Sequence, residues 1–293
     1  MWAQMQGSRP AASKSRQSRM FTRRIASDVS TQWLEADLAF DTIAVRTLAR
    51  GRTSLPVRES LAGTLSVRTT RDTMGLDLTL RADSGTVRFQ GYSLLDATRN
   101  VIHGEARLGR LDPRALVDRK ELPRLILDGT ATVAIDMAAA DTDAHVTLRL
   151  DSTSVVGDEQ LRSGEIRAGI DQSGLHVDTA EVRSPTWHLQ ARGRLARSGV
   201  TRDTLSFMVE ADSLALLRAL LLDSLGAPRA DSIGGRLRVT NGRLIGSLDT
   251  LRLEADFGAE RIQWNGSVVR ELVGEARVGG LPSAATGRVH LAA

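Results

Sequence analysis

Three short sequence elements recur in the same order along this chain, and this repetition constrains the fold more than any other feature. Each copy contains a Leu/Ile-x-Gly-x-x-x-Val segment, then a segment of alternating apolar and polar residues, then Gly-Glu-x-Arg-x-Gly. The copies are Leu61–Val67, Leu78–Asp83 and Gly104–Gly109; Leu127–Val133, Val146–Asp151 and Gly164–Gly169; and Ile233–Val239, Leu251–Asp256 and Gly274–Gly279. Period-two alternation between glycines is typical of β-strands, so the chain is predicted to be a β-repeat protein.

The composition indicates what the dry side of such strands is made of. Hydrophobic residues make up 41% of the chain, but aromatic residues only 3%. A compact core usually uses more Phe, Tyr and Trp, because these side chains bury the most area. The buried surface is therefore predicted to be a smooth aliphatic lining of Leu, Val, Ile and Ala. The chain has no Cys, which excludes disulfides and thiolate metal sites.

The charge pattern argues against nucleic acid as a partner. The pI is about 10.4, and Lys14 and Lys120 are the only lysines. Arginines alternate with acidic residues along the strands, as in Arg81-Ala82-Asp83. This is the pattern of a solvated face of mixed sign and not of a basic stripe.

The expected organisation has three parts. Residues 1–27 are polar and basic and are expected to be a disordered tail. Residues 28–60 are expected to hold a strand from Gln32 to Phe40 and a helix from about Thr42 to Arg50, which ends at Gly51. Residues 61–293 hold the repeats, which start near residues 61, 127 and 233.

Two further helices are predicted inside the repeat region. Asp112 and Pro113 form an N-cap and first-turn signal for a short helix to Val117. Ser213–Leu225 is a very apolar helix that Gly226 ends, and it is expected to cover an end or edge of the sheet. The chain finishes in the strand Gly287–Leu291 with no polar cap, so we expect a piece of a longer protein.

No arrangement of residues predicts catalysis, a metal or a cofactor. The five histidines are scattered singly, although His176 and Asp178 share a strand and His188 could lie near them. A metal needs three or four converging ligands, and none is supplied. In Gly-Glu-x-Arg, the Glu and Arg of each copy are two residues apart and lie on one wet face, where an ion pair contributes about 0–1 kcal/mol. We expect a protein that is not an enzyme.

Alternation assigns a set of apolar side chains to one dry face. Residues at the alternate positions are expected to face water, among them Thr79, Arg81, Arg88, Arg252 and Gln263. The residues expected to line the dry face are Leu65, Val67, Leu78, Leu80, Val87, Phe89, Val146, Leu148, Leu175, Val177, Trp187, Leu189, Leu205, Phe207, Val209, Leu237, Val239, Leu251, Leu253, Ile262 and Trp264.

The repeated Leu-x-Gly-x-Leu-x-Val and Leu-x-Leu-x-Ala-Asp strands, with Glu210–Leu221 joining a strand to a helix, resemble the translocation and assembly module (TamB) and AsmA-like family. The resemblance covers roughly residues 32–293 and implies a mostly β, elongated repeat sheet, curled into a hydrophobic groove, with a few short helices. About fifteen strands at a spacing of about 4.8 Å would give a sheet some 70 Å long. Open sheets of that size curl.

The resemblance also implies a function. Family members are anchored in the inner membrane and cross the periplasm; here the anchor would belong to segments absent from this chain. They are implicated in carrying phospholipid acyl chains between inner and outer membrane and in assisting outer-membrane protein assembly with a barrel partner of the TamA/BamA type. The alternatives are a structural or scaffold β-repeat protein with a side-chain-filled core and no ligand, and a surface adhesin-like β-solenoid.

Overall fold

The structure, a computed structural model, describes residues 20–28, 33–44, 60–96, 99–113, 124–138, 141–199, 202–213, 233–264, 267–281 and 286–292. Strands account for most of these residues. They are β1 (Met20–Asp28), β2 (Trp33–Ala44), β3 (Ser60–Thr69), β4 (Thr73–Ala82), β5 (Gly85–Leu95), β6 (Arg99–Leu111), β7 (Leu125–Ala138), β8 (Asp141–Leu150), β9 (Val155–Val156), β10 (Glu159–Gln160), β11 (Ser163–Ile170), β12 (Gly174–Arg183), β13 (Trp187–Ala196), β14 (Thr204–Ala211), β15 (Ile233–Ser247), β16 (Thr250–Trp264), β17 (Ser267–Leu281) and β18 (Thr286–Ala292).

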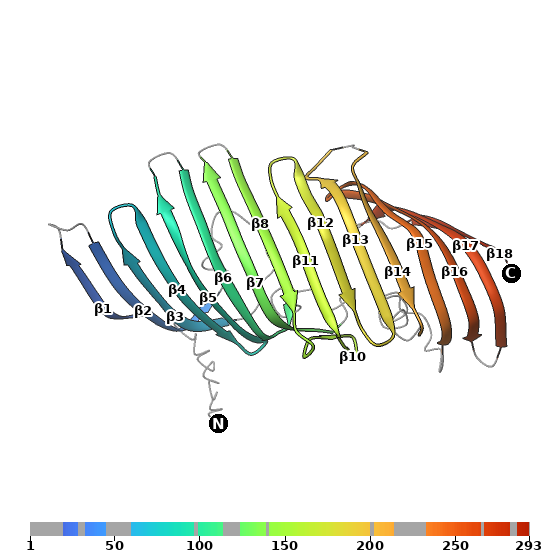
Figure 1. The fold of residues 1–293 in the computed structure, drawn as a ribbon, viewed down its shortest axis with the longest axis horizontal. Coiled ribbons are helices and arrows are strands. Elements are labelled where there is room, and N and C mark those ends of the chain that lie inside the picture. Colours follow the sequence, from blue (N-terminus) through green and yellow to red (C-terminus); the bar gives the residue numbers. More distant parts are fainter. Residues whose placement is uncertain are drawn as a thin grey trace, which may run out of the picture.

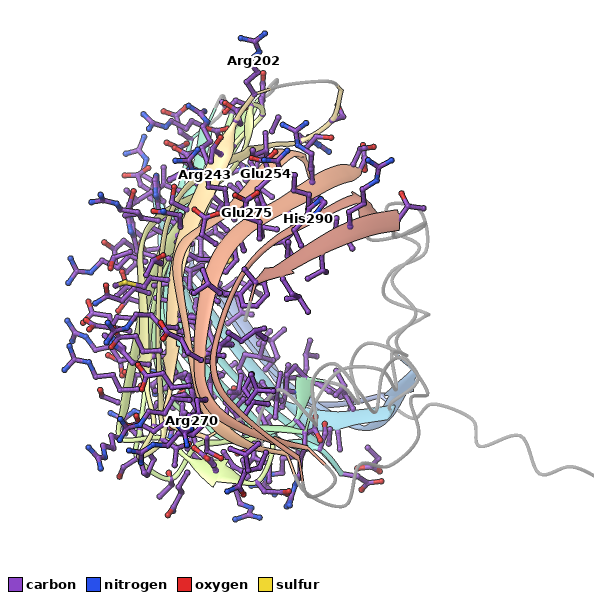
Figure 2. The ribbon with its side chains drawn as sticks, turned by 90° about the vertical axis from the view of Figure 1, so that its right-hand side faces the viewer. Arg202, Arg243, Glu254, Arg270, Glu275 and His290 are labelled. Carbon is purple, nitrogen blue, oxygen red and sulfur yellow. The ribbon has the colours of Figure 1, made fainter. Side chains whose placement is uncertain are left out.

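The strands form one long antiparallel sheet in chain order. Each strand from β1 to β8 pairs with the next, β8 pairs with β11, and the order then continues to β18. Among the described strands, β1 and β18 are not paired with each other, so the sheet is open. Figure 1 shows the strands side by side along the longest axis, and Figure 2 shows the sheet curled into a C. The prediction of a mostly β, elongated, curled sheet is confirmed.

The three sequence copies occupy strands in two different arrangements. The first elements lie in β3, β7 and β15, the second in β4, β8 and β16, and the Gly-Glu elements in β6, β11 and β17. In the second and third copies the last two strands pair directly. In the first copy β5 is inserted between them, so β6 runs in the opposite direction to β11 and β17. A near-constant spacing in sequence therefore conceals an extra strand.

Antiparallel order sends alternate connections to opposite edges of the sheet. At one edge, the short-turn edge, the connections span 29–32, 70–72, 96–98, 139–140, 171–173, 197–203, 248–249 and 282–285. The four longest connections, 45–59, 112–124, 151–162 and 212–232, all leave from the other edge, the long-connection edge. Figure 1 shows the short-turn edge at the top and β10 at the lower edge.

Two expectations for the N-terminal part are wrong. Residues 20–27 are expected to belong to the disordered tail, but they lie in β1, where β2 provides backbone partners along most of the strand. The prediction that a helix begins at Thr42 is also wrong. Strand β2 runs to Ala44, where Ile43 and Ala44 pair with Leu61 and Ser60 of β3. Residues 1–19 and 45–59 lie outside the described residues, as does the greater part of the two helices expected near 112–117 and 213–225.

Candidate functional site: the concave face of the sheet

Register divides the side chains of the sheet into two sets, because residues directly opposite each other in adjacent strands point to the same side. Three rows of partners cross most of the sheet. The first row is Leu65, Leu78, Phe89, Ala106, Ala131, Leu148, Ile166, Ala180, Ala191 and Phe207. The second is Val67, Leu76, Gly91, Gly104, Val133, Val146, Ala168, Val177, Gly193, Leu205, Leu244, Leu253 and Val278. The third is Leu80, Val87, Leu108, Gly129, Leu150, Gly164, Val182, Leu189, Val209, Val239, Phe257, Gly274 and Leu291.

These rows lie on the inner side of the curl, which we call the concave face. In Figure 2 the labelled Arg243, Glu254 and Glu275 point away from the hollow of the C, while the sticks inside it are mostly carbon. Those three residues belong to the opposite set in the register. From β2 to β18, every register-paired position of the concave face is occupied by an uncharged residue.

The concave face is not covered by a second sheet in the described part of the chain. Apolar side chains on it remain exposed, among them Val146 at 37%, Leu34 at 39% and Leu291 at 60%. Few large side chains of the described residues are buried: Phe40, Leu161, Val182, Trp187 and Leu195. A sandwich closed over this face would bury large side chains completely, because packed interiors leave few voids.

Most of the predicted dry-face residues lie on the concave face. Fifteen of them belong to the three rows, and Leu175, Trp187, Leu237 and Leu251 share the same side. Ile262 follows Arg261, whose φ of 51° interrupts the alternation, so its face does not follow from the pattern. The side chain of Trp264 lies outside the described residues. The predicted set omits the alanines of the rows and also larger apolar residues such as Leu108, Val133 and Val182. The same alternation could have identified them once their segments were known to be strands.

A small hairpin covers one part of the concave face, at the long-connection edge. Strands β9 and β10 pair with each other, and β9 pairs with the start of β7. Leu161, Val182, Trp187 and Ala211 are buried there, and Leu150, Val156, Leu189 and Leu237 pack against them. Trp187 is only 7% exposed, so it does not line an open surface as predicted, and its indole Nε1 is buried without a hydrogen-bond partner.

Polar contacts fix this hairpin to the sheet. Ser184 Oγ donates to Glu159 Oε2 at 2.7 Å, and Thr186 Oγ1 donates to the other carboxylate oxygen of Glu159. Ser154 Oγ donates to the carbonyl of Asp128 at 2.8 Å and accepts from its N–H at 3.0 Å. Buried groups whose hydrogen bonds are satisfied in this way hold a short hairpin in one position.

The two edges of the concave face therefore differ. The long-connection edge carries the apolar hairpin cluster. The uncharged polar residues of the concave face, by contrast, gather near the short-turn edge, where strands end: Thr69, Ser93, Asn100 and Thr142. Turns at this edge carry charge, as in Asp171, whose pKa is lowered by hydrogen bonds from Ser173 and Gly174 and by Arg194.

The convex face carries the charges. Each copy of Gly-Glu-x-Arg forms its own ion pair: Arg107–Glu105 at 3.4 Å, Arg167–Glu165 at 2.5 Å and Arg277–Glu275 at 3.4 Å. All three pairs are well exposed, so each contributes little to stability. Hydrogen bonds from Gln190, Arg183 and His188 lower the pKa of Glu181 on the same face. These contacts fit a solvated surface.

The histidines do not assemble a site. His176 lies against His145, with ring centroids 5.3 Å apart, and not near His188. His188 contacts Glu181, with Nε2 and Oε1 3.0 Å apart. No group of three or more potential metal ligands occurs among the residues that the structure describes. Two hollows, of about 580 and 540 Å³, indent the sheet between β12 and β17. The larger has a lining that mixes polar and apolar residues and includes Trp187 and Arg238, and the smaller has a mainly polar lining that includes Gln190.

Replacing His176 and His188 together by Ala should leave the function of the protein unchanged in cells. The two imidazoles lie apart on the convex face, His188 in the lining of the larger hollow and His176 beside His145, so they share no ligand and their loss removes only local contacts. The measurement is complementation by the double variant, with protein level and circular dichroism as controls. Loss of complementation by a folded double variant would reveal a chemical role for these residues.

Comparison with known proteins gives no relative. No family model, no curated protein and no solved structure matches this chain. Within the described residues, no helix is both long and apolar enough to cross a membrane.

Proposed function

We propose that the concave face is a hydrophobic groove that binds the acyl chains of phospholipids and carries them along the sheet. The observation that supports this most directly is the absence of charge from the register-paired positions of this face between β2 and β18. A face this long and this apolar is costly to leave in water, and monomeric proteins rarely expose apolar patches of more than a few hundred Å².

The chemistry of the lining favours a flexible hydrocarbon over a rigid or polar ligand. The face is built of Leu, Val, Ala and Gly, without directed polar groups at its centre that would select one orientation of a ligand. Each methylene group removed from water gains about 0.8 kcal/mol, wherever along the face it binds. Binding energy that is nearly uniform along a path allows a bound chain to slide.

The two edges suggest how a phospholipid would lie. The apolar cluster under the β9–β10 hairpin closes part of the long-connection edge. The short-turn edge offers polar positions such as Asn100 and Thr142, and charged turns such as Asp171–Ser173. The proposed arrangement has acyl chains on the concave face and headgroups at the short-turn edge, in water.

The wider role rests on the resemblance to the TamB and AsmA-like family. It is that of a periplasmic bridge, anchored in the inner membrane by other segments of a longer protein, that passes phospholipid towards the outer membrane and assists assembly with a barrel partner of the TamA/BamA type. The proposal involves neither an enzymatic reaction nor nucleic acid. The competing proposal is a ligand-free scaffold, and the buried cluster around Trp187 favours it locally, because side chains already fill that part of the face.

Phospholipid should co-purify with the protein. The apolar face would retain acyl chains during purification in the absence of detergent, because transfer of each chain to water costs several kcal/mol. The measurement is mass spectrometry of lipids extracted from protein after size exclusion, with a globular protein purified in parallel from the same cells as a control. Protein that is folded and free of lipid would favour the scaffold.

A further inference from the structure

The phenylalanines of the concave face do not stand up from the sheet; each lies over a glycine of a neighbouring position. A Cβ built on the glycine would fall 3.1 Å or less from ring atoms in every case. The pairs are Phe40 with Gly63, Phe89 with Gly91 and Gly104, Phe207 with Gly242, and Phe257 with Gly274. Three of these pairs are direct register partners.

This arrangement lowers the height to which the phenylalanine side chains rise above the backbone of the sheet, which forms the floor of the concave face. Side chains of a strand normally stand roughly perpendicular to the sheet. A ring that lies over glycine instead covers exposed backbone, as in the aromatic rescue of glycine. The ring then adds apolar area without rising above the Leu and Val side chains beside it. The glycine is required because a Cβ would occupy the position of the ring.

The pair Phe207–Gly242 lies where the sheet changes shape. Strand β14 has 8 residues and β15 has 15, and β15 extends past β14 to contact β13, where Leu248 N donates to Ala196 O at 2.9 Å. Figure 1 shows that β15–β18 curve away from the preceding strands. An acyl chain that is carried from one end of the sheet to the other must cross this junction.

Gly242 differs from the other glycines of the set in what surrounds it. The three nearest atoms to a Cβ built there all belong to the Phe207 ring, the farthest being Cδ2 at 2.6 Å. At Gly104 and Gly274 a backbone oxygen also lies within 2.7 Å, so a substitution there would disturb the strands themselves. At Gly242 a methyl group can be accommodated if the ring alone moves, away from the backbone and up from the floor.

We propose that an acyl chain bound on the concave face lies across the flat Phe207 ring, and that Gly242 is the specificity-determining position that permits it. This inference rests on the proposed lipid-binding function. A linear acyl chain fits because the floor at the junction is level. A raised ring would project above the neighbouring side chains. An acyl chain lying over it would then lose contact with the concave face on both sides of the ring.

The test is photo-cross-linking with a phosphatidylcholine that carries a diazirine at the end of one acyl chain. Cross-linked peptides from β14–β15 are counted relative to those from β4–β8 in the same sample. In Gly242→Ala the β14–β15 fraction should fall about tenfold, which corresponds to about 1.4 kcal/mol or the lost burial of about two methylene groups. Gly258→Ala is the matched control, because a Cβ there meets nothing within 4 Å and Gly258 pairs with Arg238 on the convex side.

The double variant Phe207→Ala/Gly242→Ala distinguishes an effect of the displaced ring from an effect of Gly242→Ala on folding. With no ring to displace, it should fold and recover the β14–β15 cross-links, and it serves as the decisive variant if Gly242→Ala alone does not fold. Failure of recovery in the folded double variant overturns the inference. So does a parent protein that cross-links at β4–β8 but not at β14–β15, or an unchanged Gly242→Ala. A parent that cross-links nowhere instead contradicts the proposed function itself.

Discussion

Leu80→Asp and Leu253→Asp should each remove most of the bound phospholipid while the protein stays folded. Both leucines belong to the uncharged rows, and both are only partly buried. In an open sheet the new carboxylate reaches water across the hollow, so the cost to folding is limited to lost contacts, about 1–2 kcal/mol. An acyl chain at that position, however, would have to desolvate a charge, which costs several kcal/mol.

Thr79→Asp is the matched control for Leu80→Asp. Thr79 is the preceding residue of β4 and pairs with Thr64 and Arg88 on the convex face, so the same charge is introduced one residue away on the other side. Lipid per protein and the thermal midpoint are measured for all three variants and the parent. Collapse of the fold in both leucine variants, together with a parent that carries no lipid, would show that side chains fill this face.

Trp187→Ala should destabilise the region around the β9–β10 hairpin by about 3–5 kcal/mol. Trp187 is 7% exposed and packs with Leu161, Val182 and Ala211, so truncation leaves a cavity that a hairpin of two-residue strands cannot fill. Its Nε1 has no hydrogen-bond partner, so the substitution leaves no polar group newly unpaired. The cost comes from packing alone.

Hydrogen exchange is the appropriate measurement, because a long sheet whose strands contact only their neighbours need not unfold as one unit. Amides of Gly157 and Leu161, which donate to Arg124 O and Ser154 O, should lose protection in Trp187→Ala, while those of β3–β5 should not. Trp33→Ala is the control: that indole is 36% exposed, and surface substitutions usually change stability by about 0.5 kcal/mol or less. Equal losses of protection in both variants would mean that the cluster does not hold the hairpin.

Alternation was sufficient to predict which side of each strand is apolar. For Leu78, Leu80 and their neighbours, a period of two determines the face once the segment is known to be a strand. Register then carries that assignment from strand to strand, so nineteen of the predicted residues fall on one side of the sheet.

What alternation could not predict depends on partners distant in the sequence. Trp187 has the correct face, but nothing local shows that residues 151–162 fold back over it. Thr42 and Ile43 are β-branched and favour a strand, but the Gly51 stop signal indicated a helix there; β3 provides the backbone partners that extend β2 through Ala44. The bulge at Arg261 removes Ile262 from the pattern, because a left-handed residue breaks the alternation that the prediction depends on.

The placement of every long connection at one edge has a consequence for how such a chain can change in length. Between successive long connections the ladder contains an even number of strands: β3–β6, β7–β8 and β11–β14. Removing or duplicating one of these blocks would leave the flanking strands antiparallel, with the same side inward and the same edge carrying the loops. A block with an odd number of strands would reverse the direction of everything downstream. The sheet can thus be lengthened or shortened in modular steps of two or four strands, each preserving the path along its inner surface.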